Sequence, residues 1–199
     1  MAYVEQSEMT DYLRSTIIAD EADIQAALLA AQSTVDAYCG RTFTVPTTAT
    51  ARTFVVDDPY VVTVPDIANS TNLAIVDAGT TISASYFQLE ISPNITGPIS
   101  VSGRTWPYTR IRRLSGTWGI SSVGDDTLSI TARWGWAAVP PEVALSTKLL
   151  CRDYLLARDT GFGLTQTGDG YLRRIAGNSV VESLLAPLRR AEVAMGIAG

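Results

Sequence analysis

Hydrophobic residues recur with helical spacing near both ends of the chain and with the closer spacing of strands between them. The clearest helix is predicted from Glu21 to Cys39, because Asp20 can cap its first turn and Gly40 follows its last turn. The face expected to be buried comprises Ile24, Ala27, Leu28, Ala31, Val35 and Tyr38.

A second long helix is predicted over residues 141–158, where Pro141 suits the first turn. One line along this helix comprises Val143, Thr147, Leu150 and Tyr154, and a second comprises Leu145, Leu149 and Leu156. Two such lines predict a helix buried on two sides. The second side could meet another part of the chain or a neighbouring subunit.

Two shorter helices are expected at the ends. One lies within residues 1–18, with Ser7 as its cap, and the other begins after a cap at Asn178 or Ser179. Residues 159–170 contain four glycines and are predicted to form a surface loop before this last helix.

The middle of the chain is rich in Thr, Val, Ile and Ser, and prolines divide it into short pieces. Seven strands are predicted there: Thr53–Val56, Tyr60–Val64, Leu73–Val76, Tyr86–Ile91, Ile99–Val101, Ile111–Leu114 and Thr127–Arg133. A short extended piece is also expected at Tyr171–Ile175. No helical pattern separates the seven strands, so an antiparallel sandwich or small barrel is expected rather than a parallel sheet.

The predicted fold class is therefore α+β, with a small helical bundle formed by the N- and C-terminal helices and a large inserted antiparallel β module. We expect residues 1–40 and 140–199 to form the helical part and residues 41–139 the insertion. Packing between helix and sheet is expected to involve Trp134, Trp136, Leu150 and Tyr154.

Composition narrows the functional classes. The net charge is −5, which argues against tight nonspecific binding to DNA. No apolar run is long enough to span a membrane, and the N-terminus lacks the features of a standard secretion signal. Cys39 and Cys151 are interpreted as buried thiols of a reducing compartment, with a disulfide between them as the alternative.

The sequence supports no catalytic site. It contains no histidine, which removes the usual general base and metal ligand. Asp57–Asp58 and Asp125–Asp126 are paired acids beside turn signals, where solvated turn residues are the better interpretation. We therefore expect no enzyme activity, no cofactor and no metal.

Basic and aromatic residues lie together near the end of the β module. Arg110, Arg112 and Arg113, near Trp106 and Tyr108, could form a nucleic-acid patch. A strand with one solvated face and an aromatic partner is the favoured interpretation.

Three segments, taken in order, resemble head-to-tail connector (adaptor, head-completion) proteins of long-tailed bacteriophages. They are residues 23–43 (DIQAALLAAQSTVDAYCGRTF), 130–143 (ITARWGWAAVPPEV) and 181–190 (VESLLAPLRR). The smaller members of that family are mostly helical and lack such a long β insertion. The resemblance therefore does not indicate the role of the insertion.

The resemblance implies a structural virion protein at the head–tail neck, assembled in the host bacterial cytoplasm. It implies a homo-oligomeric ring of twelve beneath the portal protein, which joins capsid to tail, meets a tail-side connector or tail terminator protein, and lets double-stranded DNA pass without specific binding. No membrane contact is implied. Contacts with the portal or a neighbouring subunit are expected of Arg173, Arg174, Leu184, Leu185, Leu188, Arg189 and Arg190.

An alternative is a β-sandwich binding module that recognises carbohydrate or another virion protein through Trp106, Tyr108 and Trp118. Exposed aromatic residues on the sheet would favour this alternative, whereas buried ones would favour the structural ring.

Overall fold

The computed structural model describes residues 2–13, 19–93, 95–96, 100–101, 104–119, 128–160, 164–166, 172–174 and 178–190. The fold is α+β, and the chain divides into two compact units. Met1–Phe43 and Val139–Gly199 form one unit, called here the helical unit, and Thr44–Ala138 form the other, called the β module.

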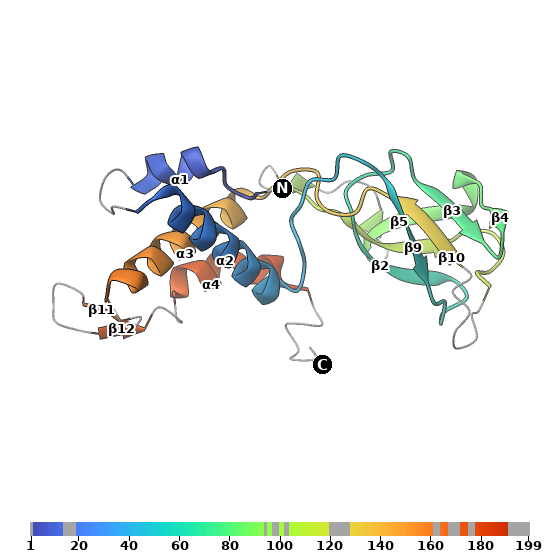
Figure 1. Cartoon of the computed structure of the whole chain (residues 1–199). Helices are drawn as coiled ribbons and strands as arrows, with labels where there is room; N and C mark the ends of the chain where they lie inside the picture. Colours follow the sequence, from blue (N-terminus) through green and yellow to red (C-terminus); the bar gives the residue numbers. More distant parts are fainter. Residues whose placement is uncertain are drawn as a thin grey trace. The chain divides into compact units, whose positions relative to one another are not determined.

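The helical unit is built around two long helices that pack against each other (Figure 1). Its helices are α1 (Gln6–Leu13), α2 (Glu21–Cys39), α3 (Pro141–Thr160), α4 (Ser179–Leu185) and the short 3-10 helix η3 (Ala186–Leu188). Two short strands, β11 (Leu164–Gln166) and β12 (Leu172–Arg174), pair in antiparallel fashion after α3. The extended piece predicted around β12 is thus part of a hairpin.

Helix α2 begins and ends where the sequence predicts. Oδ1 of Asp20 accepts a hydrogen bond from the backbone N of Asp23 at 2.8 Å, and Gly40 ends the helix with a φ of 63°. Five of the six residues predicted on its core face are buried, and Tyr38 is half-buried. The apolar spacing was therefore sufficient to place this face.

The predicted cap of α1 was wrong by two residues. The backbone N of Met9 donates to the carbonyl oxygen of Glu5, so the helix starts at Gln6 and Ser7 lies inside it. A serine side chain alone does not fix a helix start when burial of Met9 and Leu13 sets the position of the helix.

Helix α3 is buried along one side within this chain. Its buried residues are Val143, Ser146, Thr147, Leu150, Cys151 and Leu155. Of the second predicted line, Leu145 is 42% exposed, and Leu149 and Leu156 are half-buried. Of the two alternatives for this second line, the described part of the chain therefore does not cover Leu145, and contact with a neighbouring subunit stays a prediction.

The β module contains two four-stranded antiparallel sheets. The first has the order β1 (Thr50–Phe54), β10 (Leu128–Ala132), β3 (Ala74–Asp77) and β4 (Thr80–Thr81). The second has the order β2 (Val61–Ile67), β9 (Tyr108–Arg113), β5 (Phe87–Ser92) and β6 (Ile95–Thr96). Smaller elements are the 3-10 helix η1 (Ala84–Tyr86) and the pair β7 (Ser100–Val101) and β8 (Arg104–Thr105).

Strand β10 buries alternate residues, as a strand with one apolar face requires. Along β10, Leu128, Ile130 and Ala132 are buried while the residues between them are partly exposed. The core of the module comprises Val56, Val62, Val64, Ile67, Ile75, Ile111, Trp118, Leu128, Ile130, Ala132 and Trp134. Both sheets contribute to this core, which defines a sandwich-like arrangement.

Pro65 does not break the chain as predicted. Strand β2 continues through it, because β2 is an edge strand and its pairing with β9 shifts register between Thr63 and Ile67. An edge strand with an irregular register can accommodate a residue that has no N–H to donate.

Candidate assembly surfaces

The segment after residue 178 is fixed onto the helical unit by its own contacts. Oδ1 of Asn178 accepts hydrogen bonds from the backbone N of Val180 and of Val181, and its Nδ2 donates to Oδ2 of Asp153 on α3 at 3.1 Å. At the end of the segment, the backbone N of Arg190 donates to the carbonyl oxygen of Cys39 at 3.0 Å.

The residues predicted to contact the portal have different surroundings. Leu185 and Leu188 are buried and hold α4 and η3 on their own unit. Their contact with the portal or a neighbouring subunit stays a prediction. Leu184 is half-buried. The guanidinium of Arg189 lies 4.9 Å from the centre of the Tyr38 ring on α2.

Arg173 and Arg174 lie on β12, paired with Thr165 and Leu164 of β11. They are therefore placed on a hairpin between α3 and α4, and their side chains lie outside the described part of the structure. Their contact with a portal remains a prediction.

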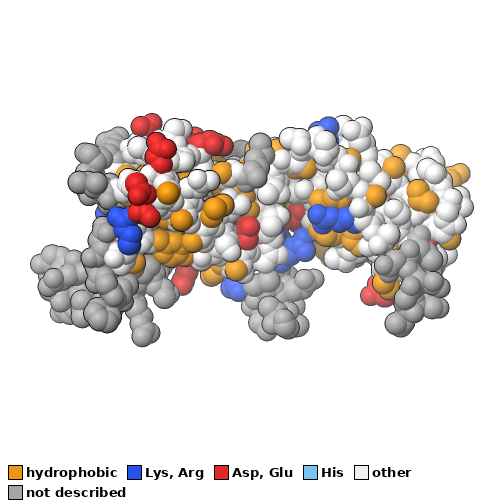
Figure 2. Space-filling model, viewed as in Figure 1, with side chains coloured by type: hydrophobic (Ala, Val, Ile, Leu, Met, Phe, Trp, Pro, Cys, Tyr) orange, Lys and Arg blue, Asp and Glu red, His pale blue; other side chains and the backbone are white. Residues whose placement is uncertain are grey.

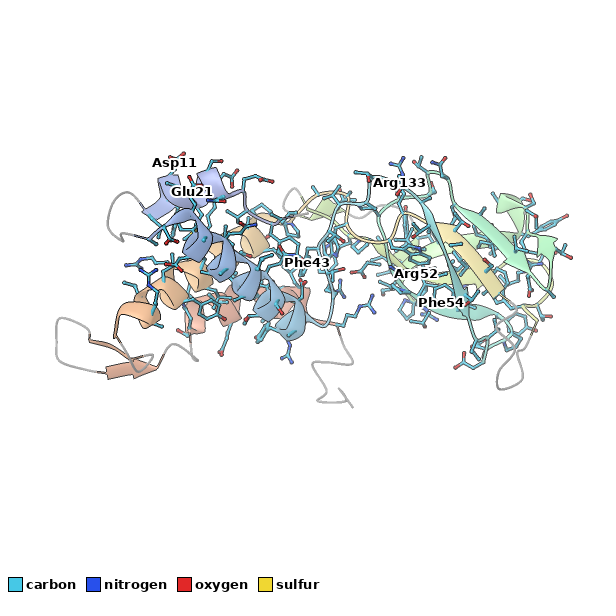
Figure 3. The ribbon with its side chains drawn as sticks, in the orientation of Figure 1. Asp11, Glu21, Phe43, Arg52, Phe54 and Arg133 are labelled. Atoms are coloured by element: carbon cyan, nitrogen blue, oxygen red, sulfur yellow. The ribbon has the colours of Figure 1, made fainter. Side chains whose placement is uncertain are left out.

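Trp134 and Trp136 are held inside the β module by hydrogen bonds from their indole nitrogens. Nε1 of Trp134 donates to the carbonyl oxygen of Thr50 at 2.8 Å, and Nε1 of Trp136 donates to Oδ2 of Asp66 at 3.0 Å. The Trp134 ring packs against Phe54, 5.7 Å between centres, and the guanidinium of Arg52 lies over it at 4.7 Å. Figure 3 labels Arg52 and Phe54 on β1.

Leu150 and Tyr154 belong to the helical unit. Leu150 is buried, and the hydroxyl of Tyr154 lies 2.7 Å from Oγ1 of Thr34 on α2. The contacts described for these two residues and for the two tryptophans lie within their own units. The expectation that all four form one helix–sheet packing site stays a prediction.

A buried tyrosine joins the N-terminal segment to the last turns of α2 and to the residues that follow it. The Tyr3 hydroxyl donates to Oδ1 of Asp36 at 2.5 Å and accepts from the backbone N of Phe43 at 2.7 Å. Burial raises the pKa of the Tyr3 hydroxyl, and the hydrogen bond to Asp36 raises it further. Burial also raises the pKa of Asp36, an effect that the hydrogen bond from Tyr3 partly offsets.

Arg110 and Arg112 surround a buried carboxylate rather than forming an open basic patch. Glu90 on β5 is 1% exposed, and Nε of Arg112 lies 2.5 Å from its Oε1. Nε of Arg110 lies 4.0 Å from its other oxygen. The hydrogen bond with Glu90 raises the pKa of the Arg112 guanidinium. Arg113 has the aromatic partner that the sequence interpretation favoured, because its guanidinium lies 4.8 Å from the centre of the Trp118 ring.

The alternative binding module requires exposed aromatic residues at Trp106, Tyr108 and Trp118, and the structure does not expose all three. Trp118 is 1% exposed and belongs to the core, which corrects its proposed role in recognition. Trp106 is half-buried and packs on Trp136, with ring centres 5.6 Å apart. A pocket of about 350 Å³ lies beside Tyr108, and Leu73, Phe87 and Leu89 supply its apolar wall.

The acids and cysteines considered from the sequence have the following surroundings. Oδ1 of Asp58 accepts from the backbone N of Tyr60 and of Val61, as expected of a turn acid. Asp125–Asp126 lie outside the described residues. Cys39 and Cys151 are free and buried. Among the described residues no group of His, Cys, Asp or Glu could hold a metal ion, and no helix is long and apolar enough to cross a membrane.

Sequence reasoning missed the buried carboxylates Asp66 and Glu90. A signal for Glu90 existed, because it lies between Leu89 and Ile91 in an apolar strand and three arginines follow on a neighbouring strand. Asp66 follows Pro65 and precedes Ile67, and nothing in that spacing indicates its bond to a tryptophan 70 positions away.

Similarity to solved structures covers nearly the whole chain. A chain of the "Neck of empty GTA particle computed with C6 symmetry" matches with a TM-score of 0.57 and 18% sequence identity, over 95% of this chain and 90% of that chain. A chain of the "Neck of native GTA particle computed with C12 symmetry" matches with a TM-score of 0.54 and 18% identity, over 93% and 87%. GTA denotes a gene transfer agent. The comparison establishes a shared fold that includes both units.

No protein-family model matches the chain. The search of curated proteins found no match either.

Proposed function

We propose that this chain is a structural protein of the neck of a phage-like particle, a head-to-tail adaptor that joins the capsid to the tail. The observation that carries the proposal is the similarity over 95% of the chain to a neck protein, because it includes the inserted β module as well as the helices. The sequence resemblance to connector proteins, in contrast, rested on residues 23–43, 130–143 and 181–190, which include little of the β module. The two lines of support are therefore complementary.

The proposed working form is a homo-oligomeric ring of twelve beneath the portal, through which double-stranded DNA passes. The neck solved with C12 symmetry supports this number by analogy. Twelve chains, each with a net charge of −5, carry about −60 in total, which disfavours tight binding of the DNA backbone and suits a channel along which DNA slides. The location follows as the virion neck, assembled in the host cytoplasm.

The proposed partners are the portal protein on one side and a tail-side connector or tail terminator protein on the other. We assign the portal contact to the hairpin of β11 and β12, where Arg173 and Arg174 can pair with acidic groups. Leu184 on α4 can add to this contact. Arg189 is better explained by its stacking on Tyr38.

The test is native mass spectrometry of the purified chain, alone and mixed with the portal protein from the same genome. A monomer that becomes a twelve-membered ring on the portal supports the adaptor function. A chain that stays monomeric beside a correctly folded portal overturns it. Arg173→Glu with Arg174→Glu should abolish binding to the portal.

A further inference from the structure

The outward side of α3 carries an apolar face that the described part of this chain covers only in part, with Leu149 and Leu156 half-buried. Leu145, Leu149, Arg152 and Leu156 recur at helical spacing, opposite the buried Val143. Leu145 is 42% exposed and Arg152 is exposed. Arg152 has no ion-pair partner within the described part of the chain. We call these four residues the α3 face.

Helix α2 carries a second face, of a different shape, that is exposed in the described part of the structure. Ala22, Ala26, Leu29, Ala30 and Ser33 are all exposed, and Leu29 is 61% exposed. No charged side chain interrupts this set, which is unusual for the solvent side of a surface helix. We call these five residues the α2 face. Figure 2 shows hydrophobic side chains gathered on the helical unit in the view that Figure 1 gives of α2.

The two faces point away from each other. Helices α2 and α3 pack together through their buried sides, so the side of each helix opposite its buried residues faces outward in opposite directions. A closed ring of more than two identical subunits needs two different surfaces on each subunit, one to meet the neighbour on either side. The helical unit has this arrangement.

We propose that the α3 face of one copy docks on the α2 face of the next copy and that this contact closes the ring. The inference rests on the proposed function, which supplies the ring. The α3 face is formed mainly by leucines, whereas the α2 face carries alanines and a serine around one exposed leucine, Leu29, and such small residues allow a second helix to approach closely. The charges also agree, because the α3 face carries the cation Arg152 and the α2 face begins beside the exposed carboxylate of Glu21, labelled in Figure 3.

The size of the contact determines when it forms. The α3 face is about 16 Å long and a helix is about 10 Å wide, so the footprint is on the order of 160 Å². Stable interfaces bury about 800 Å² per partner. The helical contact alone is therefore too small to hold free copies together, and it should close only when the portal aligns neighbouring copies.

Substitution tests the two faces separately. Leu29→Asp on the α2 face and Leu145→Asp on the α3 face should each lower the yield of portal-bound rings at least tenfold, measured by native mass spectrometry. Leu114→Asp is the matched control, because Leu114 is a similarly exposed leucine (55%) in the β module, and it should leave the yield unchanged. Circular dichroism melting should show all three chains folded, since each position is on the surface.

Crosslinking tests the head-to-tail direction. A chain with both Leu29→Cys and Leu145→Cys, assembled on the portal and treated with a flexible bis-maleimide, should form a ladder of covalent oligomers. A chain that carries only one of the two substitutions should stay monomeric on a denaturing gel, because the native Cys39 and Cys151 are buried. A chain with one substitution that links to itself would indicate a two-fold contact and would overturn the proposal.

The outcomes separate this proposal from the proposed function. Normal rings from Leu29→Asp and Leu145→Asp would overturn the interface while leaving the adaptor function intact. Absence of rings from the wild-type chain on the portal would overturn the adaptor function, and the interface with it.

Discussion

The carboxylate of Glu90 is bound most closely by Arg112, although Arg110 is its direct cross-strand partner. Arg110 lies opposite Glu90 in the register of β5 and β9, yet its Nε is 4.0 Å from the carboxylate, whereas Nε of the diagonal Arg112 is at 2.5 Å. Diagonal neighbours in an antiparallel sheet are within reach of long side chains. The pair fixes β5 against β9 on the side of the sheet opposite Ile111.

Glu90→Gln should destabilise the β module by about 1–3 kcal/mol, because an amide cannot neutralise the two guanidinium groups and turns a donor toward them. Arg112→Gln should lower the melting temperature more than Arg110→Gln, following the two distances. Thermal denaturation followed by near-ultraviolet circular dichroism measures both effects. Equal shifts for the two arginine variants would contradict the assigned geometry.

Tyr3→Phe should destabilise the chain by about 1–3 kcal/mol, because it leaves the buried backbone N of Phe43 without its acceptor and removes the donor to Asp36. The pKa of Tyr3 is raised by folding, so the folded state holds the phenolic proton more tightly than the unfolded state does. Stability from this group is present below pH about 10 and is lost as the pH rises further. Urea denaturation between pH 7 and 11 should show a steeper alkaline loss for wild type than for Tyr3→Phe.

Asp36→Asn should change how the free energy of unfolding depends on pH in the acid range. The pKa of Asp36 is raised in the folded state, so its contribution is fully present below the unfolded value of about 3.9 and is lost as the pH rises through the folded value. The asparagine variant keeps an acceptor for Tyr3 but does not titrate. Relative to this variant, wild type should lose stability as the pH is raised from 3 to 7, and a gain over that range would refute the assignment.

Gly135→Ala should destabilise the β module by about 2–4 kcal/mol. The φ of Gly135 is 138°, and an added Cβ would overlap the carbonyl oxygen of Thr44, which also accepts from the backbone N of Trp136 at 2.9 Å. Gly79→Ala is the control, because Gly79 has a φ of 80° but open space around an added Cβ. It should cost about 1 kcal/mol, as measured by denaturant titration.

The two cysteines should be unreactive in the folded chain. Burial raises the pKa of the Cys39 thiol to about 12 and that of Cys151 to about 11, so almost no thiolate is present at pH 8. A colorimetric thiol reagent should therefore label neither residue within minutes, and both should react at once in denaturant. Rapid labelling of the native chain would show that one of the thiols is accessible.

The sequence by itself determined the elements whose signals are local. Asp20 and Gly40 mark the ends of α2 because capping and a left-handed turn depend on neighbouring residues only. The strand predicted at Thr127–Arg133 likewise corresponds to β10, along which Leu128, Ile130 and Ala132 are buried. Such patterns gave the α+β class before any packing was known.

Tertiary structure decided which partners these elements met. The pairing of Trp136 with Asp66, of Glu90 with Arg112 and of Tyr3 with Asp36 joins residues far apart in the chain, and no periodic pattern encodes such pairs. The same holds for burial. The spacing predicted Leu185 and Leu145 equally as apolar contact residues, but packing buried the first and left the second 42% exposed. Periodicity shows that a residue favours an apolar neighbour, and only the packed chain shows whether that neighbour lies within the chain itself.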